Sequence, residues 1–368
     1  MNIVYIITGL GMGGAEQQVC SLADYQDYLG NNVTLISLGS CGKIKPKRES
    51  IVVEEIGMKK SPMGFLKALL YTAKILKVRD VDLIHSHMFH ANIFSRVLKL
   101  MFLKVPLICT SHTTNEGSWW RMLVYRLTDC VCDMNTSVSI DAASCAVNRG
   151  AVPKHKIKVM YNGIDTCRFY HDSSSRIYYR NLLSVSQNTK VFLAVGRMTH
   201  AKDYPNMLQA FKLVADYRHD IHLVIIGDGD ELEGIKCLTK QLSLDDKVTF
   251  LGARTDITEW MNASDYFLLS SAWEGFGLVV AEAMACEKVV IATDCGGVGE
   301  VAGNNNYLCR PNDSKALANN ILKALSLSES SYKKIGMLNR EKVSDKYSMK
   351  VISGKWSKLY SCLAEGRK

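Results

Sequence analysis

The chain has 368 residues and a formal net charge of +9; 47% of its residues are hydrophobic and only six are prolines. This composition excludes a disordered chain, and the length predicts two domains because it exceeds what one ordinary core supports. The twelve cysteines lack zinc-site and disulfide spacings, no apolar run could span a bilayer, and no basic leader precedes the first strand. We therefore expect a cytoplasmic protein with reduced thiols.

The first predicted strand, residues 2–7, runs into the glycine-rich turn TGLGMGGAE at residues 8–16. Gly9, Gly11 and Gly14 fit the G-x-G-x-x-G spacing of dinucleotide-binding folds, and a helix predicted over residues 15–29 would present its amides to a phosphate. The second predicted strand, 33–38, is not followed by the Asp or Glu that would bind an adenosine ribose. This weakens the alternative of an NAD-dependent oxidoreductase. A tight turn that binds no ligand is a further alternative, but it leaves Gly13 unexplained.

The first half of the chain is the more basic half. Residues 1–170 contain 20 Lys and Arg against 13 Asp and Glu, whereas residues 171–368 contain 25 against 23. Several lysines accompany an amphipathic helix predicted over residues 62–79, which could lie on an anionic membrane surface. An ordinary packed helix with solvated lysines is the alternative. Nucleic acid is not an expected partner, because zinc-finger spacing, an RNA-binding aromatic signature and a long basic helix are all missing.

Strand and helix patterns alternate along both halves. Further strands are predicted at 51–56, 82–86, 106–110, 157–160, 191–195, 222–226, 248–251, 266–270 and 289–292, and further helices at 206–217, 231–242 and 278–286. Short apolar strands that alternate with helices indicate parallel sheets covered on both faces. The predicted fold class is α/β, with two Rossmann-like doubly wound domains facing a central cleft at their strand ends.

Three histidines, His85, His87 and His90, lie near the end of the strand predicted at 82–86. Two of them share a strand face, but no Cys or carboxylate nearby completes a metal-ligand set. We interpret them as a strand-end cluster that lines an acceptor cleft. The acidic pairs at 80–82 and 228–230 are interpreted as a solvated strand start and a turn, so no metal site is expected.

Two cations follow the first strand of the second half, in the segment GRMTHAK at 196–202. Arg197 and Lys202 would then lie at the carboxyl end of a strand, where an arginine fork and a lysine point charge suit a diphosphate. Two solvated surface cations are the alternative.

The segment SSAWEGFGLVVAEA at 270–283 combines a strand end, a glycine-flanked turn and a helix. The turn would point Glu274 into the cleft. The amides of Phe276, Gly277, Leu278 and Val279 would lie at the helix start, where a phosphate or a sugar hydroxyl can bind. Glu282, about one turn into the helix, could accept hydrogen bonds from a ribose diol.

Six segments resemble, in order, the retaining glycosyltransferases of family 4, which have the GT-B fold: GGAE at 13–16, GRMTHAK at 196–202, GDGDE at 227–231, FLG at 250–252, EGFGLVVAEAMA at 274–285 and TDCGGVGEV at 293–301. The EGFG block is the most specific and the N-terminal glycines are the least. The resemblance implies an acceptor-binding domain at 1–172, a nucleotide-sugar-binding domain at 173–349, and a last helix at 350–366 that crosses back to the first domain.

The resemblance also implies roles for the second-domain residues. Arg197 and Lys202 would neutralise the leaving diphosphate, and Glu282 would bind the ribose hydroxyls. Glu274 would orient the transferred sugar, and Arg254 would lie where the backbone meets the base. The residues 199–201 depart from the family pattern, which often has an acidic residue or proline there, but Lys202 is retained.

In the first domain the resemblance places Gly13 and Gly14 beside the diphosphate of the nucleotide sugar. It places His112, at the end of a first-domain strand, near the sugar and the reacting centre. The segment 115–121, which contains two tryptophans, would shape acceptor choice.

The implied function is sugar transfer from a nucleotide sugar, most often UDP-linked in this family, to a glycan acceptor. A lipid-diphosphate-linked oligosaccharide of O-antigen or capsule assembly is the expected acceptor. The enzyme would be a hexosyl- or N-acetylhexosaminyltransferase that retains anomeric configuration, needs no metal or other cofactor, and sits peripherally at the inner face of the cell membrane. A nucleotide-sugar epimerase of the same fold is the alternative.

Overall fold

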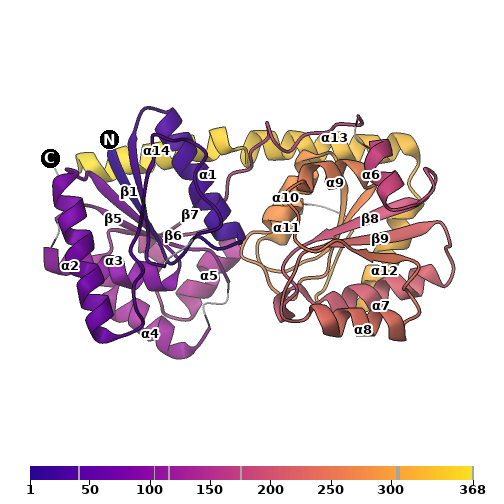
Figure 1. Cartoon of the computed structure of the whole chain (residues 1–368), viewed down its shortest axis with the longest axis horizontal. Helices are drawn as coiled ribbons and strands as arrows, with labels where there is room; N and C mark the ends of the chain where they lie inside the picture. The colour runs from indigo at the N-terminus through magenta and orange to yellow at the C-terminus, as the bar shows by residue number, and fades with distance from the viewer. Residues whose placement is uncertain (40–41, 103, 115–116, 175, 304–306, 367–368) are drawn as a thin grey trace. The chain divides into compact units, whose positions relative to one another are not determined.

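Figure 1 shows a computed structural model of the chain, which describes residues 1–39, 42–102, 104–114, 117–174, 176–303 and 307–366. The chain forms two compact units. The first comprises Met1–Gly163 with Ser348–Lys368, and the second comprises Ile164–Tyr347. Each is an α/β unit built on a parallel sheet, which confirms the predicted fold class of two Rossmann-like domains.

The first unit contains, among its described residues, a sheet of seven strands. The strands are β1 (Asn2–Ile7), β2 (Asn32–Ser37), β3 (Val52–Glu55), β4 (Leu83–His87), β5 (Leu107–Ser111), β6 (Met134–Ser137) and β7 (Ile157–Val159). The helices are α1 (Gly14–Tyr28), α2 (Pro62–Val78), α3 (Phe89–Phe102), α4 (Trp119–Thr128), α5 (Ile140–Asn148) and α14 (Met349–Glu365). The parallel strands follow the order β3-β2-β1-β4-β5-β6-β7, so the chain reverses direction across the sheet between β1 and β4.

The second unit repeats this plan over a sheet of six strands, again counted within the described ranges. The strands are β8 (Lys190–Val195), β9 (Ile221–Ile226), β10 (Val248–Phe250), β11 (Tyr266–Leu269), β12 (Val289–Thr293) and β13 (Leu308–Cys309). The helices are α6 (Arg176–Leu182), α7 (Tyr204–Ala215), α8 (Leu232–Gln241), α9 (Ile257–Ala263), α10 (Leu278–Ala285), α11 (Val298–Ala302), α12 (Ser314–Leu325) and α13 (Glu329–Lys346). The order is β10-β9-β8-β11-β12-β13, with the reversal between β8 and β11.

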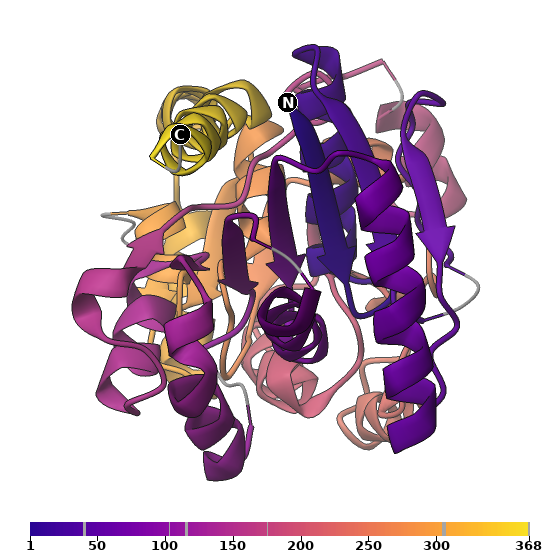
Figure 2. The same cartoon turned by 90° about the vertical axis from the view of Figure 1, so that its left-hand side faces the viewer.

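The first sheet is covered by helices on both faces (Figure 2). Ile3, Tyr5 and Ile7 of β1 pack in the cluster that includes residues of α1 and α14. The intervening Val4 and Ile6 pack in the cluster that includes residues of α2 and α3. Because both faces are buried, the strand is apolar throughout instead of alternating, as expected for a parallel sheet.

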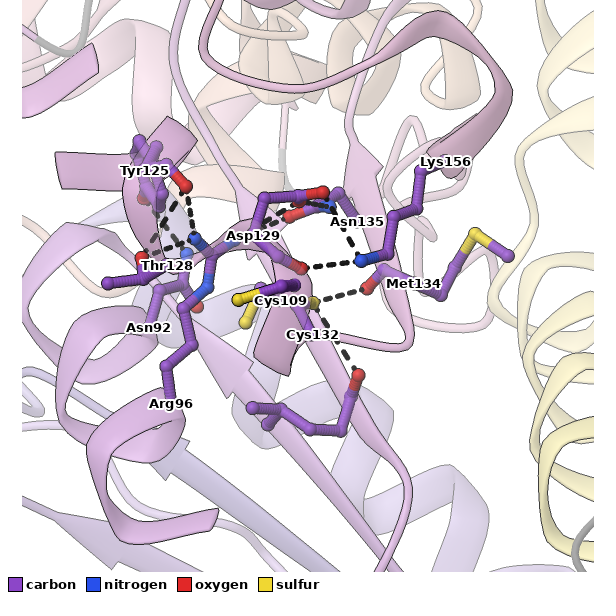
Figure 3. A network of polar contacts seen from close by, with 12 residues as sticks. Asn92, Arg96, Cys109, Tyr125, Thr128, Asp129, Cys132, Met134, Asn135 and Lys156 are labelled. Atoms are coloured by element: carbon purple, nitrogen blue, oxygen red, sulfur yellow. Dashed lines mark hydrogen bonds and ion pairs between the residues drawn. The ribbon is translucent and has the colours of Figure 1, made fainter. Parts of the chain in front are cut away.

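Strand β6 has the polar sequence Met134-Asn135-Thr136-Ser137 and is absent from the strands predicted above. Its stability depends on buried hydrogen bonds (Figure 3). The side-chain oxygen of Asn135 accepts from Arg96 at 2.7 Å, and its amide donates to Asp129 at 2.7 Å. The Arg96 guanidinium, 1% exposed, also donates to the Tyr125 carbonyl and the Thr128 hydroxyl at 2.8 Å each. A polar segment can form a central strand here because tertiary partners satisfy it.

Across the described ranges, the helices are too short or too polar for any to cross a bilayer.

Candidate active site

The reversal of strand order in the second unit brings the predicted donor-binding loops together. β8 and β11 are parallel neighbours, with Phe192 paired to Tyr266. Their carboxyl ends therefore lie at the same edge of the sheet, and open sheets of this type bind ligands at such a reversal. The loop after β8 carries Arg197 and Lys202, and the loop after β11 carries Glu274.

Lys202 and Glu274, 72 residues apart in sequence, contact each other directly. The Lys202 Nζ lies 2.5 Å from Glu274 Oε1, and the side chains are 18% and 15% exposed. The Ser271 hydroxyl donates to the same carboxylate oxygen at 2.8 Å. The ion pair holds both groups in place while the remaining lysine protons and carboxylate oxygen can still engage a ligand.

Backbone contacts fix the loop that carries the lysine. The hydroxyl of Ser270 donates to the carbonyls of Lys202 and Asp203 at 2.8 Å each, and the Ala272 amide donates to the Ala201 carbonyl at 2.8 Å. A Cβ at residue 196 would lie 3.0 Å from Cε of Lys202, so glycine at this position leaves room for the lysine side chain.

The turn after Glu274 leaves the start of α10 without a side-chain cap. Gly277 is the N-cap residue with φ of +85°, a left-handed conformation that glycine adopts without strain, and it offers no side-chain cap. The first amides of α10, at Leu278 and Val279, therefore meet no cap from that residue, as an anion-binding helix start requires. Phe276 is 2% exposed and its ring packs on Tyr347, so its side chain anchors the turn.

Glu282 projects from α10 as a buried carboxylate. The residue is 9% exposed, and burial raises its pKa to about 7, although the charges of Arg168 and Lys202 act in the opposite direction. Among the described residues, its carboxylate receives no hydrogen bond. A buried carboxylate without hydrogen-bond donors is costly, so this position favours a ligand that brings hydroxyl donors.

Arg168 is a further cation near these groups, and it was not predicted from the sequence. Its guanidinium Nη2 donates to the Thr255 carbonyl at 3.3 Å, and its charge opposes the effect of burial on the pKa of Glu282. Arg168 therefore contacts the segment predicted to meet the base. No motif in the sequence marks its position.

Two predicted cations lie at the surface. Arg197 is exposed directly after β8. Arg254 is also exposed, and it forms a two-pronged pair with Asp256, with Nε and Nη2 donating at 2.8 and 2.6 Å. This pairing lowers the pKa of Asp256 and occupies the Arg254 guanidinium, which leaves the neighbouring backbone as the part that could meet a base.

The glycine turn of the first unit caps α1. Gly13 is the N-cap residue and Gly14 begins the helix. The side chain of Glu16 folds back over Gly13, where a Cβ would collide with its carboxylate. A glutamate three residues after the N-cap commonly returns to the helix start in this way.

The three histidines predicted to line a cleft differ in exposure. His85 and His87 are 0% and 2% exposed, so the prediction is wrong for these two, whereas His90 is exposed. His85 packs against Trp356 of α14. His112 follows β5, is half-buried, and its Nε2 lies 3.0 Å from Nδ1 of His87. No cluster of residues suited to metal binding occurs in the described part of the chain.

The acceptor segment predicted at 115–121 lies partly outside the described residues, since 115 and 116 are not described. The two tryptophans begin α4 and are exposed, Trp119 by 75% and Trp120 by 44%. The Trp120 ring packs edge-on against Phe89.

Family models match both halves of the chain. The model for "Glycosyltransferase Family 4" matches residues 12–168, and the model for "Glycosyl transferases group 1" matches residues 179–341. Together they cover most of the chain.

Known relatives are similar over parts of their length. N-acetyl-alpha-D-glucosaminyl L-malate synthase of Bacillus anthracis is 31% identical over 211 residues, 56% of this chain and 54% of that protein. The chain thus spans about half the length of that relative. UDP-Gal:alpha-D-GlcNAc-diphosphoundecaprenol alpha-1,3-galactosyltransferase of Escherichia coli is 26% identical over 70% of each chain.

The structure resembles that of Anabaena Alr3699/HepE solved in complex with UDP-glucose, with a TM-score of 0.88 over 98% of this chain and 100% of that one. The two sequences are 22% identical, so the likeness concerns the fold, which is GT-B in both.

Proposed function

Because the chain belongs to the glycosyltransferases of family 4, we propose that it transfers a sugar from a nucleotide sugar to a glycan acceptor. The observation that carries this proposal is the Lys202–Glu274 pair at the strand reversal of the second unit, in the same unit as the buried Glu282. A binding site for a nucleotide sugar requires a cation for the diphosphate, a carboxylate that orients the sugar and a carboxylate that binds the ribose diol.

The chemistry follows from where charge develops. Breaking the bond between sugar and diphosphate leaves negative charge on the phosphate while the sugar becomes cation-like. Lys202, Arg197 and the open start of α10 would stabilise the departing diphosphate most strongly in the transition state. Glu274 would hold the hydroxyls of the transferred sugar, and its pairing with Lys202 keeps both groups in position. Because protein cations supply the charge, no metal or other cofactor is required.

The donor is proposed to be UDP-linked. The supporting observations concern related proteins: the Anabaena structure contains UDP-glucose, and the Escherichia coli relative is named for UDP-Gal. We infer from family membership that the new bond retains the anomeric configuration. Same-face attack, with the leaving phosphate helping to take the acceptor proton, is the route we favour.

The acceptor is proposed to be a glycan on a lipid diphosphate, in O-antigen or capsule assembly. The support is that several relatives are named for diphosphoundecaprenol-linked acceptors, including two from Campylobacter jejuni. An acceptor of that kind lies in a membrane, so the enzyme would have to reach the bilayer surface from the cytoplasmic side.

The helix α2 is the proposed membrane contact. Its inner face packs into the core through residues such as Leu69 and Leu76, which are 2% exposed. Its outer face exposes Met63 by 61% and Leu70 by 52% beside the exposed Lys67, Lys74 and Lys77. A helix that packs on one side and presents apolar groups among lysines on the other suits an anionic interface.

A panel of nucleotide sugars, screened by thermal shift and followed by mass spectrometry of the product on a polyprenyl-diphosphate-linked acceptor, tests the proposed function. We expect stabilisation by one nucleotide class and an acceptor heavier by one sugar. Rapid formation of an epimer from a UDP-sugar without acceptor would instead identify an epimerase.

A further inference from the structure

A second pocket lies at the edge of the second sheet that is opposite to the donor-binding loops. Its lining includes Lys190, Tyr266 and Lys288, which are at or directly before the first residues of the parallel neighbours β8, β11 and β12. Helices α6 and α13 contribute Arg176 and Tyr332. The pocket has a volume of about 570 Å³. Because the donor-binding loops follow the carboxyl ends of these strands, the pocket is a separate place in the fold.

Two cations meet at one carbonyl oxygen in the wall of this pocket. Nζ of Lys288 donates to the Ser264 carbonyl at 3.2 Å, and Nη1 of Arg176 donates to the same oxygen at 3.3 Å. A carbonyl is a neutral dipole, so it does not cancel two charges held this close together. Burial lowers the pKa of Lys288 to about 8, and the charge of Arg176 acts in the same direction.

The neighbouring carboxylates do not form an ion pair with Lys288. Asp265 pairs with Arg176 at 2.6 Å and with Arg180 at 3.2 Å. The charges of Asp265 and Glu287 oppose the effect of burial on the pKa of Lys288, but within the described ranges neither carboxylate pairs with its ammonium. Lys288 is 4% exposed, and its hydrogen bond to Ser264 uses one of three donors. A buried ammonium without a counter-charge is costly, so the pocket favours an anionic ligand.

The charged side chains around the pocket have an excess of two positive charges, counted over the residues that the structure describes. Five cations, Arg176, Arg180, Lys190, Lys288 and Lys333, stand against three carboxylates, Asp265, Glu287 and Glu329. A phosphomonoester carries a charge of about −1.5 to −2 at pH 7, so it matches this excess better than a single carboxylate does.

We propose that this pocket binds the phosphate group of a small phosphomonoester, with the Lys288 ammonium as its buried donor and the exposed Lys190 as a second cation. The organic part of the ligand would lie against the apolar lining, which includes Leu325 and Leu327. This binding site does not depend on the proposed sugar transfer, because none of its residues belongs to the donor-binding loops.

Titration calorimetry of the full chain with glycerol 3-phosphate tests the site, with glycerol as the uncharged probe. We expect the wild type to bind glycerol 3-phosphate and not glycerol. We expect inorganic phosphate to bind more weakly, because it makes no contact with the apolar lining. Absence of glycerol 3-phosphate binding would refute the proposal, and equal affinity for inorganic phosphate would overturn the assignment to a phosphomonoester.

Two variants test the cations. Lys288→Met replaces the buried ammonium with an apolar chain, and we expect the affinity for glycerol 3-phosphate to fall at least about tenfold. Because this variant removes a buried charge, it should melt no lower than the wild type. In Lys190→Gln, at an exposed position that does not endanger folding, we expect the affinity to fall about threefold. Wild-type affinity in either folded variant would refute the assignment.

The matched control is Lys342→Met in the same unit. Nζ of Lys342 donates to the Glu300 carbonyl at 3.2 Å, as Lys288 does to Ser264, but Lys342 does not line the pocket. This variant should keep the wild-type affinity for glycerol 3-phosphate. Lys202→Ala should also keep it, and a loss of binding in Lys202→Ala without a loss in Lys288→Met would place the phosphate at the donor site and overturn the proposal.

Discussion

The two sheets follow the same strand order apart from the additional β7, but the ends of their strands carry different groups. At the ends of β8 and β11, where the order of the second sheet reverses, lie the ion-paired Lys202 and Glu274. At the ends of the neighbouring strands β4 and β5 in the first unit lie the hydrogen-bonded His87 and His112. The second unit therefore carries an ion pair at the ends of its strands, whereas the first unit carries a pair of imidazoles.

Burial explains why each sheet can keep its kind of group. The side chains of Lys202 and Glu274 retain 18% and 15% exposure, and each lies against the opposite charge. For His87 and His112, burial lowers the pKa of both imidazoles and so favours their neutral forms. The same fold therefore provides an ion pair at the strand ends of one sheet and neutral imidazoles at those of the other.

The largest expected effect on turnover comes from removing either charge of the Lys202–Glu274 pair. Lys202→Ala and Glu274→Ala should each lower turnover by at least about a hundredfold, because a fixed charge that acts on the transition state is worth roughly 2.7–4 kcal/mol. Steady-state kinetics on folded variants would measure this loss.

An exposed lysine of the same unit serves as the control. Lys240→Ala on α8 removes a similar charge from an exposed helix position, and it should keep wild-type turnover. Near-normal activity in either site variant would refute the assignment of these residues.

A smaller effect concerns the outer surface of the first unit. Replacing Lys67 and Lys74 of α2 with Gln should weaken binding to vesicles of anionic lipid about thirtyfold, since each lysine near such a surface contributes about 1 kcal/mol. Vesicle co-sedimentation measures this change. The same substitution of Lys236 and Lys240 on α8 should have little effect, and equal losses in both variants would show that α2 is not the contact.

The buried carboxylate of the second unit predicts a pH dependence of donor affinity. Burial raises the pKa of Glu282 to about 7, and the proposed ribose diol would donate its hydrogen bonds to the ionised form. As the ionised fraction grows from about one tenth at pH 6 to about nine tenths at pH 8, affinity for a UDP-sugar should increase about tenfold. Titration calorimetry across this range tests the prediction, and Glu282→Gln should abolish the slope. A slope that persists in the variant would assign it to another group.

The smallest expected effect is on stability without ligand. The pKa of Glu282 rises from 4.5 in the unfolded chain to about 7, so the folded state retains a proton that the unfolded state has lost. The burial of Glu282 therefore costs no folding free energy below pH 4.5, and this cost grows as the pH rises from 4.5 toward 7. Glu282→Gln should melt several degrees higher than wild type at pH 8 and nearly equal to it at acidic pH. Calorimetric melting at both pH values tests this, and a lower melting temperature at pH 8 would contradict it.

Local patterns in the sequence located most elements of the fold. The predicted strand at 2–7 coincides with β1, and the predicted helix at 62–79 is α2. Strand β6 was not predicted because its residues are polar and one of them, Asn135, is hydrogen-bonded by Arg96, which lies on another element. The two-residue β13 offers too short a pattern to detect.

The candidate site was only partly predictable for a similar reason. The loops that carry Lys202 and Glu274 were visible as motifs, but their contact depends on the adjacency of β8 and β11, which no local pattern encodes. The pairing of His87 with His112 depends in the same way on the adjacency of β4 and β5. Arg168 was not predicted because no motif or periodicity marks its position in the sequence.

Titration calorimetry of nucleoside diphosphates against the wild type and two variants tests the central claim most directly. One of UDP, GDP or ADP should bind the wild type. Lys202→Ala should weaken the binding of that diphosphate but not of its nucleoside, whereas Glu282→Gln should weaken the binding of both. If none of the three binds, or if both variants bind the diphosphate as the wild type does, the second unit is not the donor site.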